Sequence, residues 1–124
     1  MTQLLAIAAG GAIGAVLRYW LSTAIQSRTA SAFPYGTLTV NVVGSLLIGF
    51  LYIWLTERMV VGPAGRAFVL IGVLGAFTTF STFSIETLNL MESGQPGKAL
   101  VNVLASVIVC VSAAAAGVLA ARQL

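Results

Sequence analysis

The residues best able to do chemistry lie in one short run, FTTFSTFS, which extends from Phe77 to Ser84. Five of its eight residues carry hydroxyl groups, and three phenylalanines are interleaved with them. On an unbroken helix, Phe77, Phe80 and either Phe83 or Ser84 would share one face at i, i+3 spacing. The run lies inside a long apolar segment, where lipid offers no hydrogen-bond partners. These hydroxyl groups therefore need partners within the protein or along a polar path.

Two other apolar segments contribute polar side chains of the same kind. Asn41 lies within TLTVNVVGS, and Ser106 lies in a later segment with Asn102 one turn before it. A single Ser or Thr usually bonds the carbonyl of its own helix, and a phenylalanine can simply pack or face lipid. Those ordinary explanations stay open. Five hydroxyl groups in eight residues, with an amide in a neighbouring segment, favour a polar path.

The chemistry of such a path would suit a small anion. Hydroxyl and amide groups donate hydrogen bonds, and the edges of aromatic rings are weakly positive. The only acid near the path, Glu86, lies toward the end of its segment, whereas a cation path would need carboxylates or many carbonyl groups. We therefore expect a small, strongly hydrated anion, because these donors can replace its water without trapping it by full charge.

The composition excludes several other classes of protein. Of the 124 residues, 59% are hydrophobic and 7% are charged, against about 25% charged residues in soluble domains. The chain therefore belongs in a lipid bilayer. It has no histidine and three well-separated glutamates, so we expect no enzyme. The six cationic residues form no cluster, so we expect no nucleic acid partner, and the single Cys110 excludes an intrachain disulfide.

Four apolar stretches are long enough to cross a bilayer, which takes about 20 helical residues. They are predicted at about 4–25, 37–56, 66–91 and 98–121, with short loops rich in glycine and proline between them. The sequence therefore predicts one all-α integral membrane domain over residues 1–124. No basic segment precedes the first stretch, so we expect a retained helix rather than a cleaved signal peptide.

The third stretch is too long for a simple span. Its 26 residues would extend about 39 Å as one helix, against a bilayer core of about 30 Å. Gly72 and Gly75 precede the hydroxyl run near the middle of the stretch. We therefore predict a break in mid-membrane between Gly75 and Thr79. The freed backbone groups would have to face protein, an ion or a water-filled cavity.

Positive charge hardly distinguishes the two sides of the membrane. With four spans, Arg58, Arg66 and Arg122 lie on one side, and Arg28 and Lys98 lie on the other, joined by Arg18 if its side chain extends that way. Either the insertion machinery sets a weak bias, or the chain inserts both ways and forms an antiparallel dimer. We favour the dimer, because four helices leave little room to enclose a pore.

Pairs of small residues indicate helix packing rather than ligand binding. Gly10 and Gly14 form a GxxxG pair in the first span, and Ser45 and Gly49 form a similar pair in the second. Such pairs let helix backbones approach closely. Arg18 lies about two turns before the end of the first span, so we expect its side chain to snorkel toward the interface or to cap structure there.

Three segments resemble the signatures of the Fluc/CrcB fluoride channel family: GGAIGAVLRYWL (10–21), GTLTVNVVGSLLIGFL (36–51) and GVLGAFTTFSTFSIE (72–86). The resemblance covers all four spans in order, and the third segment is highly specific. It implies a selective channel through which fluoride leaves the cytoplasm passively, with two pores in an antiparallel, dual-topology homodimer of the cell inner or plasma membrane. It also implies a broken third helix and a structural sodium ion at the dimer centre.

The resemblance further implies roles for single residues. Backbone carbonyls of Gly75 and Thr78 from both subunits would hold the sodium ion. Phe80 and Phe83 would turn their ring edges toward fluoride, and Asn41 would be the pore amide. The other polar residues of the pore would be Thr37, Ser81, Thr82 and Ser106.

Some positions match the family without a defined role, and others depart from it. Arg18 matches an arginine of structural or vestibular role, and Glu86 matches an acid whose role the sequence does not reveal. Ala76 replaces a second glycine found in many members, but it is small enough to leave a break intact. Cys110 replaces an expected serine, and a thiol is a weaker donor. Both phenylalanines and the asparagine are present, so a homodimer is simpler than a pair of different subunits.

Two other functions remain open. A proton-coupled exporter of the small multidrug resistance type has a similar size, four spans and balanced charge. It needs a buried carboxylate in the first span, which here contains Arg18 and no acid. A non-transporting assembly subunit could use the small-residue faces for packing, but it would leave the hydroxyl run and Asn41 unexplained.

Overall fold

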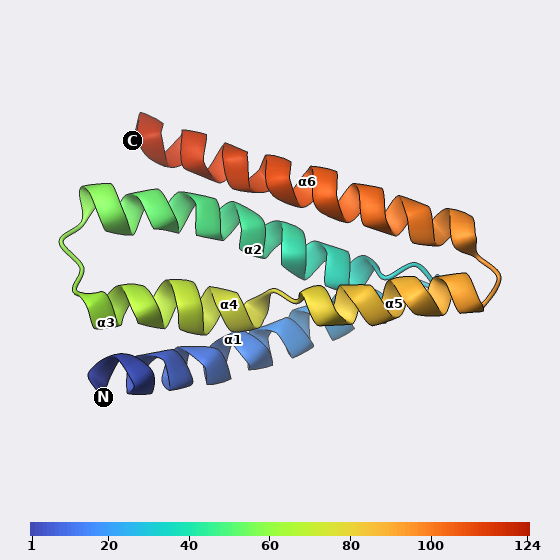
Figure 1. Cartoon of the computed structure of the whole chain (residues 1–124), viewed down its shortest axis with the longest axis horizontal. Coiled ribbons are helices and arrows are strands. Elements are labelled where there is room, and N and C mark those ends of the chain that lie inside the picture. The colour runs from blue at the N-terminus through green and yellow to red at the C-terminus, as the bar shows by residue number, and fades with distance from the viewer.

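The chain folds into four long helical spans with no β-strand (Figure 1). The structure is a computed structural model, and it describes all residues 1–124. The spans are Thr2–Gln26, Tyr35–Arg58, Pro63–Glu92 and Pro96–Gln123, and each is long and apolar enough to cross a membrane. This confirms the prediction of a four-helix, multi-pass membrane protein. The observed spans extend one to three residues beyond the predicted bounds at every end.

The first, second and fourth spans are continuous helices, and only the second changes from α-helical to π-helical geometry near its end. They comprise α1 (Thr2–Gln26), α2 (Tyr35–Ile53) with its continuation η1 (Trp54–Arg58), and α6 (Pro96–Gln123). In η1 the helix widens to i→i+5 bonding, and the Met59 N–H donates to the Trp54 carbonyl at 3.0 Å. Pro34 and Pro96 lie at helix starts, where the missing N–H of proline has no cost.

The third span is interrupted, as the sequence predicts. It contains α3 (Pro63–Arg66), the wide-turn segment η2 (Ala67–Leu74), α4 (Gly75–Phe77) and α5 (Phe80–Glu92). Thr78 and Thr79 between α4 and α5 have extended backbones, with φ of −87° and −152°. Figure 1 shows this thin connection in the middle of the span. The predicted break between Gly75 and Thr79 is confirmed.

One detail of the predicted helix face is wrong. Phe77 ends α4, whereas Phe80 and Phe83 lie beyond the break on α5. The i, i+3 spacing requires a continuous helix, and two extended residues remove it. Phe77 is instead buried and faces an apolar cavity beside Leu17 and Trp20 of α1.

Glycines pack the spans together at their closest approaches. A Cβ atom on Gly10 or Gly14 of α1 would collide with backbone of the third span, at Phe68 and Val73 respectively. A Cβ on Gly49 of α2 would likewise meet the backbone of α6. The packing roles predicted for these three glycines are confirmed.

The second and fourth spans pack closely against each other. Gly117 of α6 approaches the backbone of α2 at Leu46, across from the Gly49 contact. Gly44 of α2 leaves room for the Thr78 methyl group and the Phe77 ring at the break. In Figure 1, α2 runs between α6 and the third span. Ser45, which the sequence pairs with Gly49, is half-buried and lies on the wall of a groove described below.

Both termini and the loop before α3 lie at one end of the molecule (Figure 1). Arg58 Nη2 donates to the Arg122 carbonyl at 3.2 Å, which joins the second and fourth spans at that end. This agrees with the sequence-based placement of Arg58, Arg66 and Arg122 on one side. At the opposite end, Gly94 has a φ of +78° in the turn before α6, a conformation that glycine adopts without strain.

The first testable consequence concerns the packing of α1. Replacing Gly14 by alanine puts a Cβ into the backbone at Val73, and overpacking of this kind typically costs about 1–3 kcal/mol. Gly11→Ala is the matched control, because a Cβ there meets nothing within 4 Å. Thermal unfolding of the purified protein in detergent should show a lower midpoint for Gly14→Ala alone. Equal midpoints for the two variants would contradict the packing described here.

Candidate functional site

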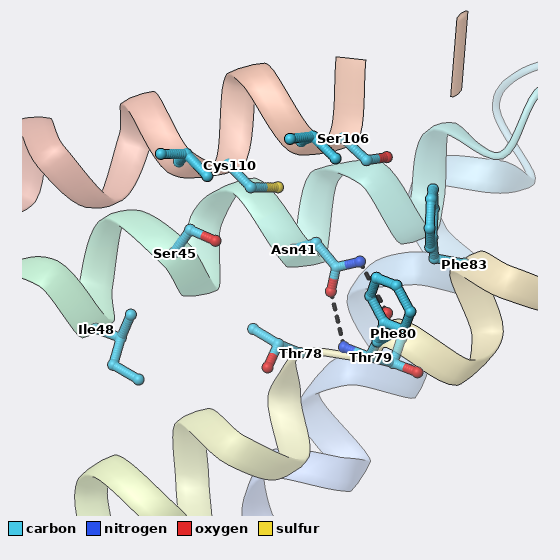
Figure 2. Close-up of a pocket in the computed structure, with 11 residues that line it drawn as sticks. Asn41, Ser45, Ile48, Thr78, Thr79, Phe80, Phe83, Ser106 and Cys110 are labelled. Carbon is cyan, nitrogen blue, oxygen red and sulfur yellow. Dashed lines mark hydrogen bonds between the residues drawn. The ribbon is translucent and has the colours of Figure 1, made fainter. Parts of the chain in front are cut away.

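An open groove of about 340 Å³ lies beside the break, between α2, α5 and α6. Figure 2 shows the side chains that line it. Four of the predicted pore residues meet there: Asn41, Phe80, Phe83 and Ser106. Its other lining residues are Ser45, Ile48, Thr78, Thr79, Val107, Cys110 and Val111. The groove therefore combines hydrogen-bond donors from three spans with two aromatic rings.

The two phenylalanine rings of the groove lie against each other. Their centroids are 5.2 Å apart and their planes are tilted by 48°. Phe83 is only 8% exposed, whereas Phe80 is 76% exposed. Phe83 is therefore held by its own subunit, and Phe80 extends outward, where lipid or another chain would meet it.

Asn41 stabilises the break by bonding both the N–H and the carbonyl group of one residue, Thr79. Its Oδ1 accepts from the Thr79 N–H at 2.7 Å, and its Nδ2 donates to the Thr79 carbonyl at 2.9 Å (Figure 2). These backbone groups lost their helical partners at the break, and lipid cannot replace them. The amide thus substitutes for the missing helical bonds. One Nδ2 proton remains for a ligand in the groove.

Thr79 is a central residue that the sequence reasoning missed. It is 8% exposed, and its Oγ1 accepts from the Thr82 N–H at 3.1 Å, which caps the start of α5. The same oxygen donates to Thr82 Oγ1 at 3.0 Å and lies 3.3 Å from Ser81 Oγ. A threonine just before a helical segment is a typical N-cap, and this signal was available in the run.

A second groove, of about 220 Å³, lies on the α1 side of the break. It is lined by Arg18, Tyr19, Ser22, Thr37, Val40, Thr79 and Thr82. Thr79 lines both grooves. The predicted polar residues are thus divided, with Thr37 and Thr82 on this side and Ser106 on the other. Ser81 is exposed and lines neither groove, although its hydroxyl contacts Thr79.

Glu86 connects the second span to α5. Thr37 Oγ1 donates to Glu86 Oε1 at 2.8 Å, while the other carboxyl oxygen is buried without a partner in the protein. Thr37 is one of the residues that line the second groove, and its bond to Glu86 fixes the direction of its hydroxyl group. Glu86 itself lines neither of the two grooves.

Free carbonyl oxygens accompany the break. The Thr78 carbonyl accepts no hydrogen bond from the protein, and the Thr79 N–H that would ordinarily reach the Gly75 carbonyl bonds Asn41 instead. No cluster of acidic, histidine or cysteine side chains could hold a metal ion. Backbone carbonyls are oxygen donors that suit a hard cation such as sodium. The residues implied by the resemblance, Gly75 and Thr78, therefore fit such an ion chemically.

Comparison with known proteins gives the same assignment as the motifs. The family described as CrcB-like protein, Camphor Resistance (CrcB), matches residues 5–118. The chain belongs to the CrcB family. A relative from Magnetococcus marinus is 53% identical over 120 residues, which are 97% of this chain and 98% of the relative. A relative from Geobacter sulfurreducens is 48% identical over 124 residues, the full length of both proteins. Each is named fluoride-specific ion channel FluC.

One of the CrcB relatives is much longer than this chain. A relative from Methylococcus capsulatus is 50% identical over 122 residues, which are 98% of this chain but 54% of the relative. It carries the same name, fluoride-specific ion channel FluC. The match to the CrcB family thus extends across all four spans described above.

The second testable consequence concerns the Asn41 clamp. Asn41→Ala leaves the Thr79 N–H and carbonyl without partners, and each unsatisfied buried group costs about 1–3 kcal/mol. Ser45→Ala is the control, because Ser45 lies one turn away on the same groove wall and its side chain makes no hydrogen bond in the structure. Thermal unfolding in detergent should show a marked loss of stability for Asn41→Ala only. A midpoint equal to that of Ser45→Ala would contradict the clamp.

Proposed function

We propose that this chain is a passive, selective fluoride channel of the cell membrane, not an enzyme. The observation that carries the proposal is the first groove, in which Asn41, Ser106 and two phenylalanine rings meet in an apolar span. The relatives named fluoride-specific ion channel FluC support the same conclusion. Fluoride is small and strongly hydrated, so it needs several donors close together to replace its water.

The groove offers such donors without a full positive charge. Asn41 retains one amide proton, Ser106 has a hydroxyl, and aromatic edges are weakly positive. Cys110 follows one turn after Ser106 on the same wall, where its thiol is a weaker donor (Figure 2). On the other side of the break, Thr37 and Thr82 line the second groove, with Arg18 nearby as the vestibular cation. The Thr37 proton is donated to Glu86, whereas Thr82 retains its own hydroxyl proton. Fluoride would therefore meet donors on both sides of Thr79.

We propose further that the working unit is an antiparallel homodimer with two pores. A single chain leaves the groove open, and Phe80 is 76% exposed at its edge. A second copy would close the groove and cover that ring. The nearly equal division of cationic residues between the two sides removes the usual barrier to dual topology.

A sodium ion at the centre of this dimer is part of the proposal. The carbonyl oxygens of Gly75 and Thr78 are the groups that would hold it, since the break deprives them of helical donors. A bound cation would offset the partial negative charge of these oxygens inside the lipid. Gly75 is exposed, so a second copy can approach it.

The rival functions are less consistent with these features. A proton-coupled exporter of the small multidrug resistance type needs a buried carboxylate in its first span, and α1 contains none. Glu86 is bonded to Thr37 and lines neither groove. A non-transporting subunit would have no need for an amide with a free proton in an open groove.

The third testable consequence is fluoride transport itself. Liposomes loaded with potassium fluoride should release fluoride rapidly once valinomycin lets potassium leave, while chloride is retained, as a fluoride electrode would record. Phe80→Ile and Phe83→Ile should abolish most of this efflux with the dimer intact, because both rings line the groove. Phe50→Ile is the matched control, because that ring stacks on Trp54 and lines neither groove.

Three results would contradict the proposal. Efflux that needs no valinomycin and follows a proton gradient would indicate a coupled transporter. No efflux from a well-folded dimer would favour the non-transporting subunit. Equal loss of efflux in Phe50→Ile and Phe83→Ile would mean that the groove has no special role.

The fourth testable consequence concerns sodium. If the ion binds only the folded dimer, a concentration about 100 times its dissociation constant would stabilise the dimer by about 2.7 kcal/mol. Unfolding should therefore have a higher midpoint in sodium chloride than in potassium or N-methylglucamine chloride of equal ionic strength. Asn41→Ala should reduce this difference, because it releases the break. Identical midpoints in all three salts for the unmodified protein would contradict the sodium site.

A further inference from the structure

Asn102 of α6 is a buried amide that the proposed pore does not use. Only 1% of its surface is exposed, and it lines neither groove. Its Nδ2 donates to Thr87 Oγ1 of α5 at 2.9 Å. Burying an amide is costly without such a partner, so this bond explains how the amide is tolerated. It does not by itself explain what the amide does.

The bond continues from Thr87 to Phe83. Thr87 Oγ1 donates its only proton to the Phe83 carbonyl at 2.7 Å, one turn back along α5. The lone pairs of the same oxygen accept from Asn102. The Asn102 amide therefore fixes the direction of the Thr87 hydroxyl, and the two bonds form one chain from α6 to the backbone of Phe83.

The chain joins the two walls of the first groove. Phe83 on α5 lines that groove, and Ser106, one turn after Asn102 on α6, lines it from the other side. On its N-terminal side, α5 is connected to α4 only by the extended residues Thr78 and Thr79. The break thus leaves the rotation of α5 to be set by its contacts with neighbouring helices, and the Asn102–Thr87 bond is the one side-chain hydrogen bond between α5 and α6.

We propose that Asn102 is a positioning residue for the anion path. Through Thr87 it sets the rotation of α5 against α6, and with it the distance of the Phe83 ring from Ser106 and the preference of the path for fluoride over chloride. This inference rests on the proposed function, because it assigns the selectivity of the same groove. Asn102 itself touches no ion.

A purely structural role for the same bonds makes a different prediction. If the chain only stabilised the fold, its removal would lower stability and leave the selectivity of the remaining folded channels unchanged. Replacing both polar partners by apolar residues of similar shape can be nearly neutral for stability. The double variant Asn102→Leu with Thr87→Val therefore separates the two roles. It leaves neither side chain as an unpaired buried polar group, and it still removes the positioning bonds.

The test compares fluoride and chloride efflux from liposomes for four variants and one control. For Thr87→Val, Asn102→Leu and the double variant, the ratio of fluoride to chloride efflux should fall about fivefold to tenfold, the factor that one net hydrogen bond represents. Thr87→Ser keeps the hydroxyl and should restore the ratio. Asn89→Leu is the matched control, because Asn89 is exposed on the same helix and its side chain makes no hydrogen bond.

A spectroscopic measurement follows the ring directly. In protein labelled with fluorophenylalanine, the ¹⁹F resonance assigned to Phe83 through Phe83→Leu should shift in the double variant and not in Asn89→Leu. An unshifted resonance would overturn the inference. So would an unchanged ratio of fluoride to chloride efflux in a folded double variant, provided that the wild-type protein conducts fluoride. In that case the proposed function would stand. Absence of fluoride flux in the wild type would overturn the proposed function, and the selectivity role with it.

Discussion

The pair of hydrogen bonds between the Asn41 amide and the Thr79 backbone is the interaction on which the site depends. A helix interrupted within a bilayer exposes backbone groups that lipid cannot satisfy. Here a side chain from a neighbouring span takes both groups of Thr79, at 2.7 and 2.9 Å. The break can then persist in mid-membrane, within the hydroxyl run. Thr78 is left with a free carbonyl, and Phe80 and Phe83 line the first groove while Phe77 lines a separate apolar cavity.

The rest of the fold supports that interaction. Gly44 opposite the break admits the Thr78 methyl group, and Gly10 and Gly14 bring α1 against the half of the third span that precedes it. The two grooves follow from this arrangement, because Thr79 separates them and lines both. Donors therefore lie on either side of one clamped residue. That geometry suits a small anion which exchanges water for protein donors in steps, and it supports the fluoride channel that we propose.

The sequence predicted the elements better than their long-range contacts. Hydropathy and length are local properties, so the four spans and the break near Gly75–Thr79 could be inferred directly. The shared face of Phe77, Phe80 and Phe83 was wrong, because helical periodicity assumes the continuity that the break removes. Three polar pairs join residues far apart in the chain: Asn41 with Thr79, Thr37 with Glu86, and Asn102 with Thr87. These pairs depend on how the spans pack against one another, and local sequence patterns do not determine that packing.

We have proposed that this clamped break serves passive conduction of fluoride. The decisive measurement is the reversal potential of the current in planar bilayers under a fluoride gradient. We expect the current to reverse at the fluoride equilibrium potential, and we expect this reversal potential to stay unchanged when chloride or proton gradients are imposed. A reversal potential that follows chloride would contradict selectivity. A reversal potential that follows the proton gradient would contradict passive conduction.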